Sequence, residues 1–176
     1  MHSDHEDTLQ RILDEIGNRV RGPVVPSRVL KLVVHVRRSN AVDGRVYGST
    51  VPTHAVAEAL HKASRSLRVT APIGFVIETN LVSQDPDENL AVLFDRVYDK
   101  TDPVEAFQLF LDCSYLIVGT SSFSYSAALL RGRRCTGSFP FWHKPLPTWD
   151  SFHCDCAVLP PYKNESMWLD LAWFSR

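Results

Sequence analysis

The residues that most constrain the fold lie between Val29 and Val36, where the sequence reads VLKLVVHV. The run is almost continuously apolar, is rich in β-branched side chains and follows Pro23 and Pro26. Strands buried on both faces have this composition, and they occur mostly in parallel sheets that helices cover on each side. The run therefore predicts a central strand of a parallel α/β sheet.

Helix and strand patterns alternate along the rest of the chain. The spacing of Val56, Ala59, Leu60 and Ala63 predicts a helix over 54–66. Further strands are expected at 73–78, more weakly at 90–94, and at 115–119, and further helices after Asp102 and over 123–130. Such alternation implies βαβ units, so the predicted fold class is a doubly wound, mostly parallel α/β sheet of Rossmann-like type.

The helix expected after Asp102 has the clearest start signal in the chain. Asp102 supplies an N-cap acceptor, Pro103 occupies the first helical position, and Glu105 is placed to reach back toward the cap. Phe107, Phe110 and Leu111 then give the helix an apolar side. We therefore expect this helix to begin at Pro103.

The two ends of the chain have different patterns. Leu9, Ile12, Leu13 and Ile16 predict an amphipathic helix over 8–19. Residues 139–176 contain all four tryptophans and many prolines, which exclude a long helix or a central strand. We expect a wrap with aromatic anchors and a short helix over 167–174. The predicted organisation is one domain over 1–176, with an N-terminal helix and linker at 1–28, a βα core at 29–138 and an extension at 139–176.

Composition limits the possible partners. The 176 residues include 19 basic and 20 acidic ones, for a formal net charge of −1. This length suits one domain, and the balanced charge argues against a general nucleic-acid or membrane-surface binder. A bound anion must therefore be held by a local group of residues.

The apolar runs and the first residues of the sequence bear on where the chain is expected. No apolar run reaches the roughly 20 residues of a membrane helix, and the polar start is unlike a secretory signal. The chain as written is expected in the cytoplasm, or in the secretory pathway (ER or Golgi) if it belongs to a longer precursor. His143, His153, Cys154 and Cys156 provide enough ligands for zinc, but their irregular spacing favours reduced or buried thiols, and no metal is expected.

The first candidate site follows the opening strand. Alternation along a strand places His35 and Arg37 on one face and Arg38 on the other. Guanidinium groups bind phosphate oxygens in a bidentate manner, so these three side chains suit a phosphate, and the loop over 41–53 is long enough to cover a ligand. The alternative is that the basic residues only solvate the end of the strand.

The second candidate site is the segment from Gly119 to Ser124, at the end of the strand expected over 115–119. Small hydroxyl residues that open a helix expose backbone N–H groups at its positive end, which binds anions. The alternative is simple N-capping by serine or threonine. The segment has neither the glycines of GxGxxG nor the lysine of a P-loop, which argues against a standard dinucleotide or ATP site.

Both segments fall at the carboxyl ends of predicted parallel strands, where ligands bind in such sheets. A basic pair that faces a helix N-terminus suits a diphosphate without a divalent metal. The natural candidate for the ligand is a nucleotide-sugar donor.

At these residues the sequence resembles the fucosyltransferases. His35-Val36-Arg37-Arg38 is similar to the HxRR signature of the α1,6-fucosyltransferase group, with relatives among the α1,2- and protein O-fucosyltransferases. The segment from Asp112 to Ser124 is similar to the family's late motif, an apolar strand followed by SSFS or SSQ. Phe75 to Asn80 lies where the family has a strand that ends in Thr-Asp. The three motifs cover roughly 29–131.

The resemblance implies an inverting, metal-independent GT-B glycosyltransferase that moves fucose from GDP-fucose to a glycan or protein hydroxyl. Arg37 would contact the donor diphosphate and be essential for catalysis, with His35 on the same phosphates and Thr79 and Asn80 near the nucleoside. Ser121 and Ser122 would hold phosphate through backbone and hydroxyl groups. The remaining residues assigned to donor binding are Arg38, Asn40, Thr120, Phe123 and Ser124.

The sequence departs from the family at several points. Asn40 replaces an aspartate, and Arg45 lies where the α1,6 enzymes have a catalytic glutamate, which leaves Asp43 as the nearest carboxylate and candidate general base. The length matches only the donor-binding half of a GT-B enzyme. Two alternatives to a complete enzyme therefore remain. The first is a non-catalytic nucleotide-sugar-binding module, or a truncated part of such an enzyme. The second is a plain α/β domain in which these residues serve only the fold. Phe141, Trp142 and Trp149 are expected to anchor the wrap rather than border the crevice.

Overall fold

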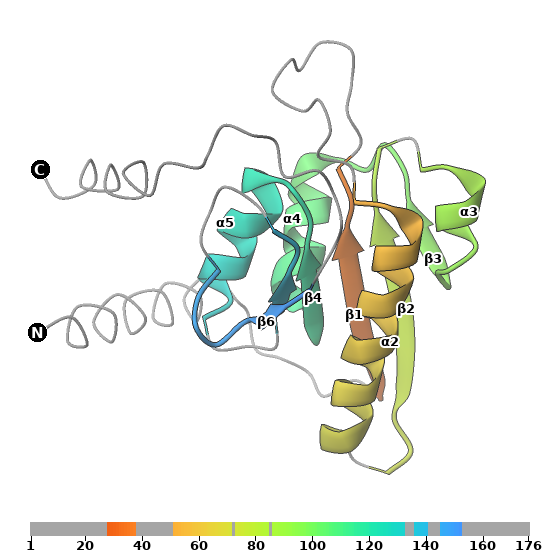
Figure 1. The fold of residues 1–176 in the computed structure, drawn as a ribbon, viewed down its shortest axis with the longest axis vertical. Helices are drawn as coiled ribbons and strands as arrows, with labels where there is room; N and C mark the ends of the chain where they lie inside the picture. The colour runs from red at the N-terminus through yellow and green to blue at the C-terminus, as the bar shows by residue number, and fades with distance from the viewer. Residues whose placement is uncertain are drawn as a thin grey trace, which may run out of the picture.

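The computed structural model describes residues 28–37, 51–71, 73–84, 86–132, 136–140 and 145–152. Within these ranges, six parallel strands form one sheet with helices on both faces (Figure 1). The elements are β1 (Val29–His35), α2 (Thr53–Thr70), β2 (Val76–Val82), α3 (Glu88–Ala91), β3 (Arg96–Tyr98), α4 (Pro103–Asp112), β4 (Tyr115–Val118), α5 (Ser122–Leu130), β5 (Thr136–Ser138) and β6 (Asp150–Ser151). The predicted doubly wound parallel α/β architecture is confirmed.

The order of the strands places β1 inside the sheet. The strands lie in the order β3-β2-β1-β4-β5-β6. β1 pairs with β2 from Val29↔Val76 to His35↔Val82, and it pairs with β4 on its other side. The direction of winding reverses between β1 and β4. In parallel α/β sheets, such a reversal opens a crevice beyond the carboxyl ends of the strands.

Alternate residues of β1 enter different cores. Leu32 and Val34 pack with the buried face of α2, whereas Val33 packs with residues of α4 and α5. All three side chains are completely buried. The two faces of the sheet are therefore covered by different helices, and the predicted strand buried on both faces is confirmed.

The expected starts of two helices are also confirmed. Asp102 caps α4, because its Oδ1 accepts hydrogen bonds from the N–H groups of Val104 at 2.8 Å and Glu105 at 3.4 Å. Ser121 caps α5 by accepting from the N–H of Phe123 at 3.3 Å. The helix expected over 54–66 extends over Thr53–Thr70, one turn beyond the prediction.

Two strand predictions are corrected. The weaker strand expected over 90–94 is wrong, because Asp87 caps the short helix α3 there and the strand follows at Arg96–Tyr98. The strand expected over 73–78 occupies Val76–Val82 instead. Its position follows from residue-by-residue pairing with β1 through His35↔Val82.

Of the wrap expected over 139–176, the structure describes residues 139–140 and 145–152. β5 was not predicted, and β6 is a two-residue strand at the edge of the sheet, as the prolines require. Trp149 is buried against Tyr125, with ring centroids 5.4 Å apart, which confirms its role as an anchor. The helices expected over 8–19 and 167–174 lie outside the described residues.

A buried arginine joins the ends of α4 and α5. Arg131, which follows α5 directly, is 1% exposed. Its Nη1 donates to the carbonyl oxygens of Phe110 at 2.6 Å and Cys113 at 2.8 Å. The carbonyls at a helix C-terminus carry partial negative charge, so they stabilise this cation. Arg131 therefore fastens the C-terminal ends of both helices together.

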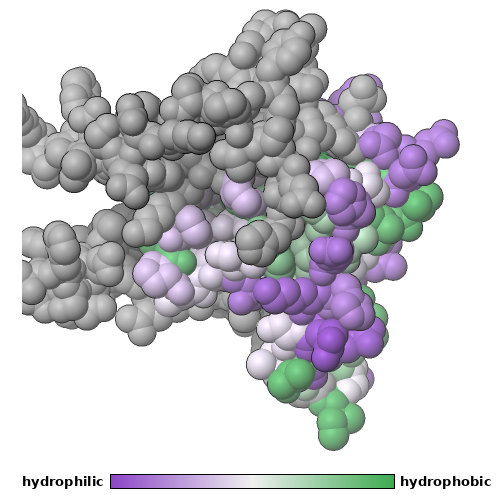
Figure 2. Space-filling model, in the orientation of Figure 1, coloured by the Kyte–Doolittle hydropathy of each residue, from purple (hydrophilic) through white to green (hydrophobic). Residues whose placement is uncertain are grey.

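Exposed apolar side chains gather at the amino edge of the sheet. Val69, Ile73 and Val76 lie where α2 ends and β2 begins and are all more than half exposed. Apolar surface is visible at this lower end of the molecule in Figure 2.

Among the described residues, no helix combines the length and apolar character needed to cross a bilayer.

Gly119, directly after β4, allows β1 and β4 to approach closely. A Cβ at this position would lie 2.2 Å from the carbonyl oxygen of His35. That oxygen belongs to the backbone, so it cannot rotate away as a side chain would. Gly74 differs, because a Cβ there would meet no atom within 4 Å although its φ is +92°.

We predict that Gly119→Ala lowers the free energy of unfolding by about 3 kcal/mol, because the methyl group forces the ends of β1 and β4 apart. Gly74→Ala, which brings only backbone strain, should cost about 1 kcal/mol. Urea unfolding followed by circular dichroism measures both. Equal losses in the two variants would contradict the close approach at Gly119.

Candidate functional site

A pocket of about 300 Å³ opens at the carboxyl edge of the sheet. It lies beyond the ends of β1, β2 and β3 and beside the N-terminal ends of α4 and α5. The residues that line it are His35, Val36, Arg37, Val82, Ser83, Gln84, Tyr98, Lys100, Thr101, Pro103, Ala106, Ser121 and Phe123. This is the position in which ligands bind to sheets of this topology.

The pocket brings the two candidate segments together. His35 and Arg37 come from the end of β1, and Ser121 and Phe123 come from the start of α5. β1 and β4 are neighbours in the sheet, so the turn into α5 necessarily lies beside the end of β1. The expectation that both segments border one crevice is therefore confirmed for these four residues.

His35 is neutral in this setting. Burial, and then the nearby charge of Arg37, lower the pKa of His35 from 6.5 to about 4. Its ring lies against Phe110, with centroids 5.2 Å apart, and against Phe123 at 6.2 Å. Its buried Nδ1 has no hydrogen-bond partner among the described residues. An imidazole in this state can exchange hydrogen bonds with a ligand but brings no charge at pH 7.

The serines at the start of α5 have structural as well as possible binding roles. Ser121 lines the pocket while its hydroxyl caps the helix. The Ser124 hydroxyl is buried and donates to the carbonyl of Ser121 at 3.3 Å. Ser122 and Thr120 do not line the pocket. The N-capping alternative therefore accounts for Ser121 Oγ, and any anion contact by this segment falls to the backbone of the first turn.

Phe123 forms an aromatic wall of the pocket. Its ring is 5.4 Å from that of Phe107 and 5.6 Å from that of Phe110, between centroids. The side chain is nevertheless 37% exposed. An aromatic ring held on one side and open on the other offers a surface on which a base or a sugar can stack.

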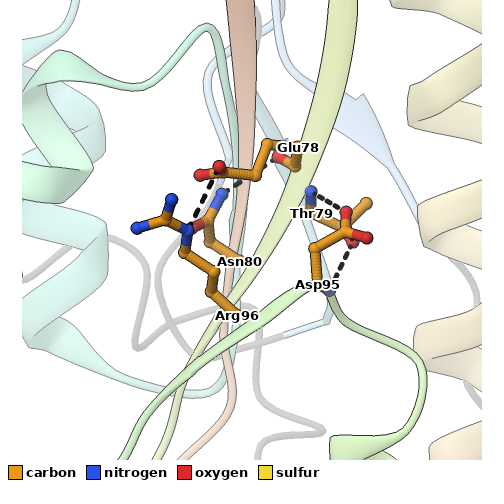
Figure 3. A network of polar contacts seen from close by, with 5 residues as sticks. All are labelled: Glu78, Thr79, Asn80, Asp95 and Arg96. Atoms are coloured by element: carbon orange, nitrogen blue, oxygen red, sulfur yellow. Dashed lines mark hydrogen bonds and ion pairs between the residues drawn. The ribbon is translucent and has the colours of Figure 1, made fainter.

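Thr79 and Asn80 are not at the pocket. β2 continues past them to Val82, so both lie within the strand, Thr79 about 10 Å before its end at 3.3 Å per residue. The N–H and hydroxyl of Thr79 donate to Asp95 at 2.8 and 2.7 Å, and these bonds lower the pKa of Asp95 (Figure 3). Asn80 is fully buried and donates to the carbonyl of Glu78 at 2.9 Å.

These polar residues hold β3 against β2. Figure 3 shows Thr79 beside Asp95, the residue before β3, and Glu78 beside Arg96, the first residue of β3. The ion pair between Arg96 Nε and Glu78 Oε2 spans 3.1 Å. The placement of Thr79 and Asn80 near a nucleoside is not supported by their position. Ser83 and Gln84 take that place at the end of β2.

Several lining residues were missed in the sequence. Ser83 and Gln84 follow Leu81-Val82 and precede Asp85-Pro86, and this change from apolar to turn-forming residues marks the end of a strand. Tyr98 ends β3, and Lys100 and Thr101 lie between β3 and α4; all three were missed because β3 itself was misplaced. Pro103 was interpreted only as the first residue of a helix, and Ala106 was not singled out.

Other predicted residues fall outside the described part of the chain. These are Arg38, Asn40 and Asp43 of the first motif, the possible zinc ligands His143, His153, Cys154 and Cys156, and Phe141 and Trp142. Within the described ranges, no group of three or more histidine, cysteine or acidic residues is arranged to hold a metal ion.

The pKa of His35 makes stability depend on pH. The unfolded chain binds this proton near pH 6.5 and the folded chain only near pH 4. The stability that the neutral imidazole provides is thus complete above pH 6.5 and is lost as pH falls to 4. The expected loss is about 3 kcal/mol. Urea unfolding at several pH values between 7 and 4 measures this slope.

His35→Phe keeps an aromatic ring against Phe110 and removes the titration, so the variant should lose less stability over this pH interval than the wild type. His61→Gln changes an exposed histidine of α2 and should leave the slope as it is. The same slope in His35→Phe and the wild type would show that His35 is not the group responsible.

Comparison of the chain with protein-family models, with curated proteins and with solved structures finds no match. No relative therefore supplies a function or a set of residue roles. What can be inferred comes from the pocket itself: a basic strand end and a helix start that meet beside an aromatic wall.

Proposed function

We propose that this chain is the donor-binding domain of a glycosyltransferase that transfers fucose from GDP-fucose to a glycan or protein hydroxyl, with inversion and without a metal ion. One observation carries the proposal. Arg37 and Ser121, which belong to the two motifs that resemble fucosyltransferases, line the same pocket at the point where the strand order reverses. Any sheet with this strand order brings the two segments together, so the support for the proposal is the chemistry that they bring to the pocket, a guanidinium and the N-terminal end of a helix.

The features of the pocket fit the leaving group of such a transfer. As the acceptor oxygen bonds to the sugar carbon, the bond from that carbon to the diphosphate breaks and negative charge collects on GDP. The Arg37 guanidinium and the N-terminal end of α5 both border the pocket and are the positive groups that would lie beside the diphosphate bound there. Positive groups that are already in place lower the barrier without reorganisation. Phe123 adds a surface for stacking.

The first experiment titrates GDP and GDP-fucose into the protein by calorimetry. We expect Arg37→Ala to weaken GDP binding by about 10- to 100-fold, since a hydrogen-bonded charge contributes about 1.5–3 kcal/mol. Arg28→Ala is the matched control, because it removes an exposed arginine just before β1, at the opposite edge of the sheet.

Three results are decisive in this titration. Equal weakening by Arg28→Ala and Arg37→Ala would mean that only net charge matters. Absence of GDP binding at millimolar concentration would reject the donor site. Loss of binding after EDTA is added would reject metal independence.

A non-catalytic nucleotide-sugar-binding module is the second candidate function. The observation that favours it is the absence of any carboxylate among the described residues that line the pocket. An inverting transferase needs a base that takes the proton of the acceptor hydroxyl. Asp43, outside the described residues, is the carboxylate proposed for that role.

We predict that Asp43→Asn leaves the affinity for GDP unchanged and reduces turnover of GDP-fucose by at least 100-fold, in line with the usual contribution of a general base. Release of GDP from GDP-fucose, with and without added glycan acceptors, measures turnover. Tight binding of GDP-fucose by the wild type with no GDP release under any condition would favour the binding module. Unchanged turnover in the variant would exclude Asp43 as the base.

A further inference from the structure

We propose that Lys100 and Arg37 bind the same ligand from two sides of the pocket, and that these two cations make the site prefer a diphosphate to a monophosphate. The inference rests on the proposed function and adds a specificity-determining residue to its site. Sequence patterns did not single out Lys100, which lies in the connection between β3 and α4.

The first support is the position of the two cations. Both Arg37 and Lys100 line the pocket, one after β1 and the other after β3. β2 lies between these strands, so their ends are about 10 Å apart at a spacing of about 4.8 Å per strand. Cations on long side chains that approach one pocket from separate strands are suited to two anionic groups rather than one.

The second support is the charge of the pocket wall. His35 is neutral, and the described residues that line the pocket include two cationic side chains, Arg37 and Lys100, and no carboxylate. Asp102 lies close in sequence, but its carboxylate caps α4 through the N–H groups of Val104 and Glu105. The local positive charge stands out in a chain whose net charge is −1.

The third support is the backbone at Lys100. Its φ is +52°, and no other non-glycine residue of the described chain has a positive φ. Glycine adopts this conformation without strain, whereas a lysine side chain raises its energy. Strain of this kind is found at binding sites, where the surrounding structure maintains it. Together with the position in the pocket, the strain indicates that the side chain has a use that glycine would not serve.

The test compares the affinities for GDP and GMP in the wild type, Lys100→Ala and Lys100→Gly. Both variants should lose about tenfold in affinity for GDP and less than about threefold for GMP, so that the preference for GDP falls. Lys100→Arg should retain most of the preference. Lys31→Ala, at an exposed lysine of β1 four residues before His35, is the matched control and should change neither affinity.

Thermal unfolding separates binding from folding. Lys100→Gly relieves the strained φ, so its Tm should equal or exceed that of the wild type although its affinity for GDP is reduced. A lower Tm together with reduced affinity for both nucleotides would indicate a structural role and overturn the proposal. An unchanged ratio of GDP to GMP affinity in the variants would overturn it as well.

Inorganic pyrophosphate and phosphate distinguish this inference from the proposed function. Wild-type binding of pyrophosphate but not GDP would reject the nucleotide donor while leaving the diphosphate pair intact. Weaker GDP binding in Arg37→Ala but not in Lys100→Ala would retain the donor site and reject the role of Lys100. Absence of binding to every probe would reject both.

Discussion

The whole site depends on how closely β4 approaches β1. The carbonyl of His35 lies where a side chain of residue 119 would begin, so only glycine permits the two strand ends to stay side by side. Because the strands are joined there, the turn into α5 is carried to the end of β1. Arg37 and Ser121, far apart in the sequence, become parts of one wall. The geometry of the pocket is thus a consequence of backbone packing in the sheet rather than of contacts among its polar side chains.

Much of this fold could be predicted because local patterns agree with the final structure. The apolar run of β1 predicts burial on both faces, which Leu32 to Val34 show, and Asp102 with Pro103 determines the start of α4. Strand alternation and the HxRR-like segment were sufficient to place His35 and Arg37 together. The start of α5 followed from its serines. In each case a few neighbouring residues determine the outcome.

The remaining features are set by contacts that sequence spacing does not reveal. Leu90 looks like part of a strand, but the cap at Asp87 and burial against the α2 face make it helical. The end of β2 is decided by its register with β1, so Thr79 falls inside the sheet and Ser83 at the pocket. The neutral state of His35 arises from its burial and from the nearby charge of Arg37, and the rings of Phe110 and Phe123, which lie against it, come from the packed helices α4 and α5.

Arg131 has a consequence for how variants of this protein are interpreted. It binds the carbonyls at the C-terminal end of α4, while the N-terminal ends of α4 and α5 border the pocket at the opposite end of both helices. Arg131 holds the C-terminal ends of the two helices together, so we expect its loss to shift the N-terminal ends that border the pocket. A substitution at Arg131 can therefore abolish ligand binding although its side chain is buried away from any ligand. A binding assay alone would then wrongly assign Arg131, which lies away from the pocket, to the residues that contact the ligand.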